Sequence, residues 1–86
     1  MKWRVHVRIL PRAGLLDPQG QAIEHALAAL EFPEAGNVHV GKAIALDVAA
    51  DTADAAVSRV RQMCDRLLAN PVTEDYEIEV EPGARS

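Results

Sequence analysis

The chain has 86 residues, a formal net charge of −4 and one cysteine, so it forms one small domain without a disulfide of its own. This length leaves no room for a catalytic core beside a cofactor domain. The acidic balance argues against nucleic acid as a partner, because phosphate contacts need a basic surface. No apolar run approaches the about 20 residues that span a bilayer, and no leader-like segment precedes the first strand; we therefore expect a cytoplasmic protein that does not bind membranes.

The first predicted element is a strand over residues 2–10, where apolar and polar residues alternate strictly. A period of two is typical of a strand with one buried face. The outward face of this strand is basic, since it carries Lys2, Arg4, His6 and Arg8.

The second predicted element is a helix over residues 18–31. Asp17 is a strong N-cap residue, and Pro18 suits the first helical position, where its missing N–H costs nothing. Apolar residues at helical spacing predict a stripe that packs on the core. This stripe consists of Ala22, Ile23, Ala26, Leu27 and Leu30.

Gly20 is the unusual residue of this helix start. Glycine in a helix costs about 1 kcal/mol relative to alanine, and a capping box would place Glu or Gln at this position. The glycine indicates either a close approach to the backbone, which we interpret as the backbone of another chain, or an unusual angle at which the chain enters the helix. The substitution Gly20→Ala is therefore expected to leave the isolated fold intact or slightly firmer while it weakens assembly.

The middle of the chain predicts a strand over residues 38–48 with one largely apolar face. A hairpin that turns at Gly41 and Lys42 is the competing interpretation, because glycine suits a turn, but the unbroken register favours one long strand. The other face carries a stripe of small residues, Ala43, Ala45 and Ala49. We interpret this stripe as a subunit contact, because a free antiparallel sheet normally shows polar residues to water.

The C-terminal part predicts a helix from Asp51 or Thr52 to about Ala69, followed by a strand over residues 75–81 with an acidic outer face. Cys64 falls on the apolar side of the helix, where a thiol usually packs as a small hydrophobe. Asn70 can cap the helix end before the following proline. We expect a single domain over residues 1–82 and a flexible tail over residues 83–86.

These elements predict an α+β fold, in which an antiparallel sheet of three or four strands carries two helices on one face, related to the ferredoxin-like arrangement. In that topology the first and last strands are neighbours, so their basic and acidic outer faces lie opposite each other. Because a core of this size supplies only about 3–5 kcal/mol, we also expect a dimer that assembles through the sheet.

The residues offer no catalytic constellation. The histidines lack the short spacings of metal sites, so we expect no metal, and Gly41 with Lys42 lacks the preceding loop of a phosphate-binding motif. The acidic residues between 74 and 81 are spaced as a solvated strand face. The residues therefore indicate a small binding or assembly module.

Four segments in the same order carry a family resemblance. They are Leu16–Leu27 (LDPQGQAIEHAL), Val40-Gly41-Lys42, Met63–Val72 (MCDRLLANPV) and Glu74-Asp75-Tyr76. Together with the length and the element order, they resemble the PurS family, the small subunit of phosphoribosylformylglycinamidine synthase. The connection Arg12-Ala13-Gly14 and the alanine-rich middle strand depart from the family pattern.

The resemblance implies a subunit of a glutamine-dependent, ATP-using ligase of de novo purine biosynthesis. Subunits of this family form homodimers or larger assemblies, bridge a glutaminase subunit and a large synthetase subunit, and help to form the ammonia path. They carry no known catalytic residues. The resemblance implies no cofactor for this chain, since ATP and Mg are used by the synthetase subunit.

The partner-contact residues expected from this resemblance are Asp17, Gln19, Gly20, Lys42, Asn70, Glu74, Asp75 and Tyr76. Asp17 and Asn70 also serve as helix caps and Tyr76 as a core aromatic, so most of the functional weight falls on Gln19 and Gly20. The alternative function is a small-molecule-binding regulatory module of the ACT type, which shares the element order. A phosphatase-like enzyme ranks third, because the chain lacks a loop that would cradle an anion.

Overall fold

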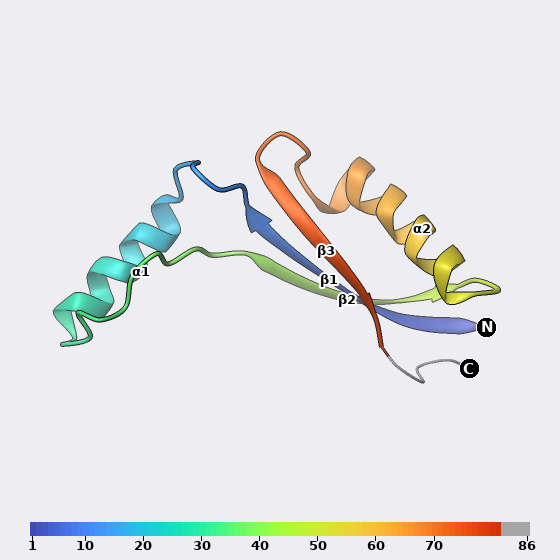
Figure 1. The fold of residues 1–86 in the computed structure, drawn as a ribbon, viewed down its shortest axis with the longest axis horizontal. Helices are drawn as coiled ribbons and strands as arrows, with labels where there is room; N and C mark the ends of the chain where they lie inside the picture. Colours follow the sequence, from blue (N-terminus) through green and yellow to red (C-terminus); the bar gives the residue numbers. More distant parts are fainter. Residues whose placement is uncertain (82–86) are drawn as a thin grey trace.

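The computed structural model describes residues 1–81; the predicted tail over residues 83–86 and the predicted domain end at residue 82 lie outside the described residues. The elements in chain order are β1 (Lys2–Pro11), α1 (Pro18–Ala29), β2 (Lys42–Ala49), α2 (Ala53–Met63), the π-helical turn η1 (Cys64–Leu68) and β3 (Glu74–Val80) (Figure 1). The predicted order of strand, helix, strand, helix and strand is confirmed, and the fold is α+β.

The three strands form one antiparallel sheet in the order β2-β1-β3. The predicted pairing of the first and last strands is confirmed. On the outer face Arg8 contacts Glu77 at 3.1 Å, and His6 contacts Glu81 at 2.9 Å. These pairs are exposed to water, so they select the pairing of the strands more than they stabilise it.

The opposite face of the sheet is covered by α2. The core between them includes Val5, Val7 and Ile9 from β1 and Val60 and Cys64 from the helical side, all fully buried. The helix starts at its N-cap Thr52, as the sequence predicts. The prediction that Cys64 packs as a small hydrophobe is confirmed, and burial raises the pKa of its thiol.

Helix α1 does not lie on the sheet, so the expectation that both helices cover one face holds for α2 alone. Over residues 1–81, α1 makes no substantial packing contact with a strand or with α2, and it projects beyond the end of the sheet (Figure 1). The chain extends to 50 Å and its radius of gyration is 16.3 Å, whereas a compact chain of this length has about 12 Å. The predicted core stripe of α1 is consequently exposed except for the half-buried Leu27.

The physical reason for this placement is the segment over residues 38–41, which is neither part of a long strand nor a hairpin turn. Strand β2 begins at Lys42, whose partner in β1 is Ile9. Further along β1, Pro11 has no N–H to offer a neighbouring strand. The N–H groups of Val38 and Val40 instead donate to carboxylates of α1. Residues 38–41 therefore tie α1 to a continuation of β2, away from the sheet.

Helix α1 ends two residues earlier than predicted. Glu31 adopts a left-handed backbone with φ 73, and the N–H of Phe32 donates to the carbonyl oxygen of Leu27 at 2.9 Å. This geometry is the Schellman ending of a helix, with glutamate where glycine is more usual.

Candidate functional site

The predicted site residues fall into two groups at one end of the sheet. The first group surrounds the start of α1, and the second lies in the turn between η1 and β3. The connection from β1 to α1 joins them, since the N–H of Arg12 donates to the carbonyl oxygen of Thr73 at 2.9 Å. Lys42 lies at the same end, and its Nζ donates to the carbonyl oxygen of Leu68 at 3.4 Å.

Asp17 joins α1 to the segment before β2. Its Oδ1 accepts a hydrogen bond from the N–H of Gly20 at 3.0 Å, and its Oδ2 accepts one from the N–H of Val40 at 2.9 Å. Nδ1 of His39 lies 3.4 Å from the same Oδ2. The two backbone donors and this histidine hold the pKa of Asp17 below its ordinary value, although partial burial opposes them. Asp17 is the predicted N-cap residue and is also a clamp between two segments.

Gly20 is buried because α1 and the segment before β2 approach each other closely there. A Cβ at this position would lie 2.2 Å from the carbonyl oxygen of Val38 and 2.7 Å from Oδ2 of Asp17. The close neighbour is therefore the chain's own backbone rather than that of another chain. This contact reverses the expected effect of Gly20→Ala on the isolated fold, because the added methyl group would push α1 off the segment before β2. Gln19, beside it, is exposed.

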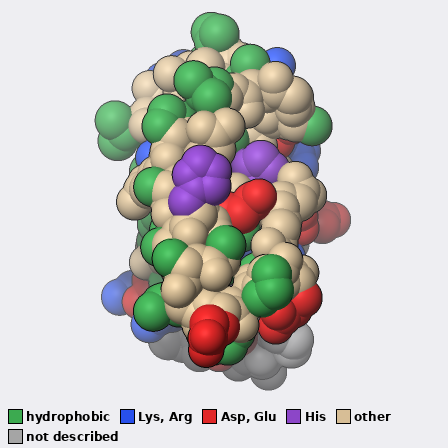
Figure 2. Space-filling model, turned by 90° about the vertical axis from the view of Figure 1, so that its left-hand side faces the viewer, with side chains coloured by type: hydrophobic (Ala, Val, Ile, Leu, Met, Phe, Trp, Pro, Cys, Tyr) green, Lys and Arg blue, Asp and Glu red, His purple; other side chains and the backbone are tan. Residues whose placement is uncertain are grey.

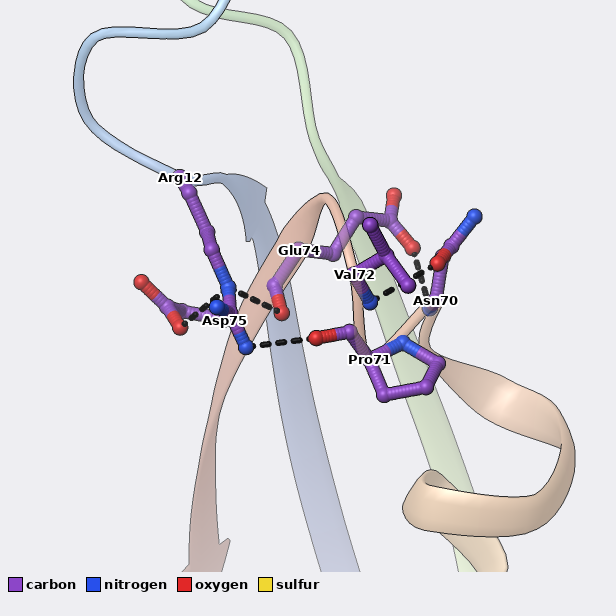
Figure 3. Close-up of polar contacts among 6 residues, drawn as sticks. All are labelled: Arg12, Asn70, Pro71, Val72, Glu74 and Asp75. Carbon is purple, nitrogen blue, oxygen red and sulfur yellow. Dashed lines mark hydrogen bonds and ion pairs between the residues drawn. The ribbon is translucent and has the colours of Figure 1, made fainter.

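The prediction that Asn70 caps the helix end is wrong, because the C-cap is Ala69. Asn70 lies in the turn between η1 and β3, which is held by its own polar side chains. Oδ1 of Asn70 accepts from the N–H of Val72 at 2.9 Å, and Oε1 of Glu74 accepts from the N–H of Asn70 at 2.8 Å. Arg12 reaches this turn from the end of β1 and donates to the carbonyl oxygens of Pro71 and Glu74 (Figure 3).

Arg12 also makes an ion pair with Asp75, with Nε 3.3 Å from Oδ1 (Figure 3). Sequence reasoning missed Arg12 as a member of the site. The available signal was an arginine directly after the proline that ends a strand, in a chain whose last strand starts with Glu74 and Asp75.

Tyr76 connects β3 to the π-helical turn. Its hydroxyl donates to Oδ1 of Asp65 at 2.9 Å. Burial and the neighbouring Asp65 carboxylate raise the pKa of Tyr76. The turn itself was not foreseen: the N–H of Ala69 donates to the carbonyl oxygen of Cys64 at 3.0 Å, five residues back. Such π-helical turns occur frequently at functional sites.

Exposed apolar side chains accompany these polar groups. Leu16 and Val72 are 74% and 75% exposed, and a shallow hollow lies between the two connections, lined by Pro11, Leu15, Leu16, Thr73 and Glu74. Figure 2, which views the molecule from the α1 side, shows hydrophobic side chains spread over the α1 end together with histidine and carboxylate groups. A mixed surface of this kind is suited to binding another protein.

Three carboxylates at this end make contacts within the chain. The carboxylates of Asp17 and Glu74 accept from backbone N–H groups, and Asp75 faces Arg12. Within residues 1–81, no cluster of three or more His, Cys, Asp or Glu side chains could hold a metal ion. None of the helices in that range has the length and apolarity to cross a membrane.

Comparisons with known proteins by sequence and by structure identify the same family. The family model described as PurS: Phosphoribosylformylglycinamidine (FGAM) synthase matches residues 4–82. The chain is 40% identical over 79 residues to the phosphoribosylformylglycinamidine synthase subunit PurS of Bacillus subtilis, and the match covers 92% of this chain and 93% of the relative. The corresponding subunit of Mycobacterium leprae is 41% identical over 75 residues, covering 87% and 91%.

Solved structures agree with this match. The crystal structure of Methanocaldococcus jannaschii PurS superposes with a TM-score of 0.82 at 37% identity, covering 92% of this chain and 95% of the other. A chain of the structure of PurLQS from Thermotoga maritima superposes with a TM-score of 0.87 at 30% identity, covering 94% and 99%. Since sequence and fold agree over nearly the whole length, this chain belongs to the PurS family of phosphoribosylformylglycinamidine synthase subunits.

Proposed function

We propose that this chain is the assembly subunit of a phosphoribosylformylglycinamidine synthase of de novo purine biosynthesis. In this function it bridges a glutaminase subunit and a large synthetase subunit and supports the transfer of ammonia between them. The observation that carries the proposal is the family match over residues 4–82. The Thermotoga maritima relative, which comes from a PurLQS structure, supports the assembly role.

The function is physical rather than catalytic. Ammonia released by a docked glutaminase stays close to the synthetase site, so a diffusing reactant becomes a locally confined one. A closed contact between the subunits also limits the entry of water. ATP and Mg are used by the synthetase subunit, and this chain needs no cofactor of its own. The same proposal puts the chain in the cytoplasm, in a complex with a second copy of itself and with the two partners.

The proposed partner-contact surface is the end of the sheet described above. Asp17, Gly20 and Asn70 shape this surface, because their polar groups and close contacts fix the two connections. The exposed residues Gln19, Lys42 and Asp75 offer polar contacts, with Glu74 and Tyr76 half-buried at the same end. Leu16 and Val72 add apolar contacts that sequence reasoning did not include.

A co-purification experiment with the glutaminase and synthetase subunits tests this surface. The paired substitutions Leu16→Asp and Val72→Asp are expected to reduce capture of the partners by about tenfold or more, because charged groups replace apolar anchors. The control is Ala55→Asp on the exposed side of α2, which should leave capture unchanged. Equal capture by the paired variant and the wild type would remove this end of the sheet as the contact.

Thermal stabilisation by an amino acid or a nucleotide, in the absence of partners, separates the assembly subunit from the ACT-type alternative. A regulatory module predicts a clear increase in melting temperature with one of these ligands, because binding to the folded state alone stabilises it. An assembly subunit predicts no such increase.

A further inference from the structure

The turn between η1 and β3 is not anchored by packing. Pro71, Val72 and Thr73 are all exposed, so their side chains add little to the core. Asn70 shapes the turn locally, since its carbonyl oxygen accepts from the N–H of Thr73 at 3.2 Å and its Oδ1 accepts from the N–H of Val72 at 2.9 Å. These local bonds do not tie the turn to the connection between β1 and α1.

Arg12 makes that link. Its N–H donates to the carbonyl oxygen of Thr73 at 2.9 Å, and its Nη2 donates to that of Pro71. Its Nε lies 3.5 Å from the carbonyl oxygen of Glu74 and 3.3 Å from Oδ1 of Asp75 (Figure 3). In the part of the chain that the structure describes, every hydrogen bond that joins the three exposed turn residues to a segment outside the turn comes from Arg12.

Arg12 also begins the connection that carries Leu16. Its carbonyl oxygen accepts from the N–H of Leu15 at 3.3 Å, and Gly14 between them has φ 84, a left-handed conformation that glycine adopts without strain. These residues form a tight turn, and the exposed Leu16 follows it directly. One arginine therefore joins the two connections that carry the exposed apolar side chains of this end.

We propose that Arg12 is a positioning residue for docking: it holds the turn that carries Val72 at a fixed place relative to Leu16 before a partner arrives. Arg12 acts through Val72 and does not itself contact the partner. A surface that is already ordered in the free protein loses less conformational entropy on binding, so this link raises affinity. The role rests on the proposed function, because it needs docking to the glutaminase or synthetase subunit.

Titration of the chain into the glutaminase and synthetase subunits measures the effect on docking. Glutamine-dependent turnover gives a half-saturating concentration of the chain and a plateau. Arg12→Ala should raise the half-saturating concentration about tenfold and leave the plateau unchanged, because the turn becomes ordered again in the complex. The matched control Arg8→Ala removes another arginine that pairs with β3, at 3.1 Å from Glu77, and should change neither value. An unchanged half-saturating concentration in Arg12→Ala would overturn the proposal.

A double-mutant cycle with Val72→Ala separates positioning from direct contact. If Arg12 acts through Val72, Arg12→Ala should raise the half-saturating concentration by less than about twofold once Val72 is truncated. An arginine that contacts the partner itself would produce the same fold-change in both backgrounds. That result would make Arg12 a contact residue and overturn the positioning role.

NMR relaxation of the free chain supplies a measurement that needs no partner. The backbone order parameters of Val72 and Thr73 should be about 0.85 in the wild type and in Arg8→Ala, and below about 0.6 in Arg12→Ala. Those of β1 and α2 should stay unchanged, which shows that the variant still folds. A turn that is equally ordered without the Arg12 side chain would overturn the proposal.

The outcomes distinguish the positioning role from the proposed function. If the wild type raises glutamine-dependent turnover and Arg12→Ala does so at the same concentration, only the positioning role fails. If the wild type has no effect on glutamine-dependent turnover, the proposed function fails, and the positioning role fails with it.

Discussion

The substitution Gly20→Ala places two opposite effects in competition. Alanine is the better helix former by about 1 kcal/mol. Against this gain, the new Cβ would lie 2.2 Å from the carbonyl oxygen of Val38, and overpacking of this kind costs about 1–3 kcal/mol. The separation that relieves the clash also weakens the hydrogen bonds from Val38 and Val40 to the α1 carboxylates, each worth about 1 kcal/mol. The expected net loss for α1 is about 2 kcal/mol.

Amide hydrogen exchange resolves this loss, because it reports the opening of α1 separately from that of the sheet. A loss of about 2 kcal/mol corresponds to exchange that is about 30-fold faster in α1, with β1, β3 and α2 unchanged. The control Gly36→Ala introduces a Cβ with nothing within 4 Å, so α1 exchange should stay the same or slow slightly. Unchanged or slower exchange in Gly20→Ala would refute the close contact with Val38.

Three further perturbations test the polar contacts of the same end. The pKa of Asp17 is lowered in the folded chain, so the contribution of its carboxylate to stability is complete above the ordinary value of 3.8 and is lost as the pH falls through the lowered value. Opening of α1, measured by amide hydrogen exchange, should therefore increase over that pH range in the wild type. The same pH dependence should be flatter in Asp17→Asn. The pKa of Tyr76, the only tyrosine, is raised above 10, first by burial and then by Asp65; its absorbance titration should have a midpoint above 10, and Asp65→Asn should lower the midpoint only in part. Arg12→Lys keeps the charge but loses the fork of donors, so the free energy of unfolding in urea should fall by about 1 kcal/mol for this half-exposed group. An unchanged urea midpoint would mean that Arg12 does not hold the turn between η1 and β3.

The strands and helix starts were predictable because local patterns dictate them. Strict alternation identified β1, and the acidic alternation near the C-terminus identified β3. Asp17 and Thr52 cap the two helices, as their side chains suggest. These features depend on neighbours within a few residues, which a sequence shows directly.

The position of α1 was not predictable in the same way. Its apolar stripe indicates that one side will be buried but does not say against what. The competing contacts come from Asp17 and Glu24, whose carboxylates accept from backbone N–H groups 14 to 23 residues away. Polar residues on a helix usually face water, so this use of two carboxylates leaves no pattern in the sequence.

In the candidate site, too, local features were predictable from the sequence and long-range contacts were not. Residues chosen by family resemblance do gather at one end of the sheet, because the two connections that carry them meet there. The prediction for Gly20 was wrong in one respect: the backbone that comes close is that of Val38 in the same chain, not that of another chain. Arg12 was missed because its partners lie 59 to 63 residues away, and only the fold brings the end of β1 against the turn before β3.

The most direct test of the bridging role is the turnover of the reconstituted synthase with two nitrogen sources. The glutaminase and synthetase subunits are assayed with glutamine and, separately, with ammonium, each with and without this chain. We predict that the chain restores glutamine-dependent turnover and leaves ammonia-dependent turnover nearly unchanged, because it confines ammonia rather than activating the synthetase. Glutamine-dependent turnover that is equal with and without the chain would contradict the proposed function.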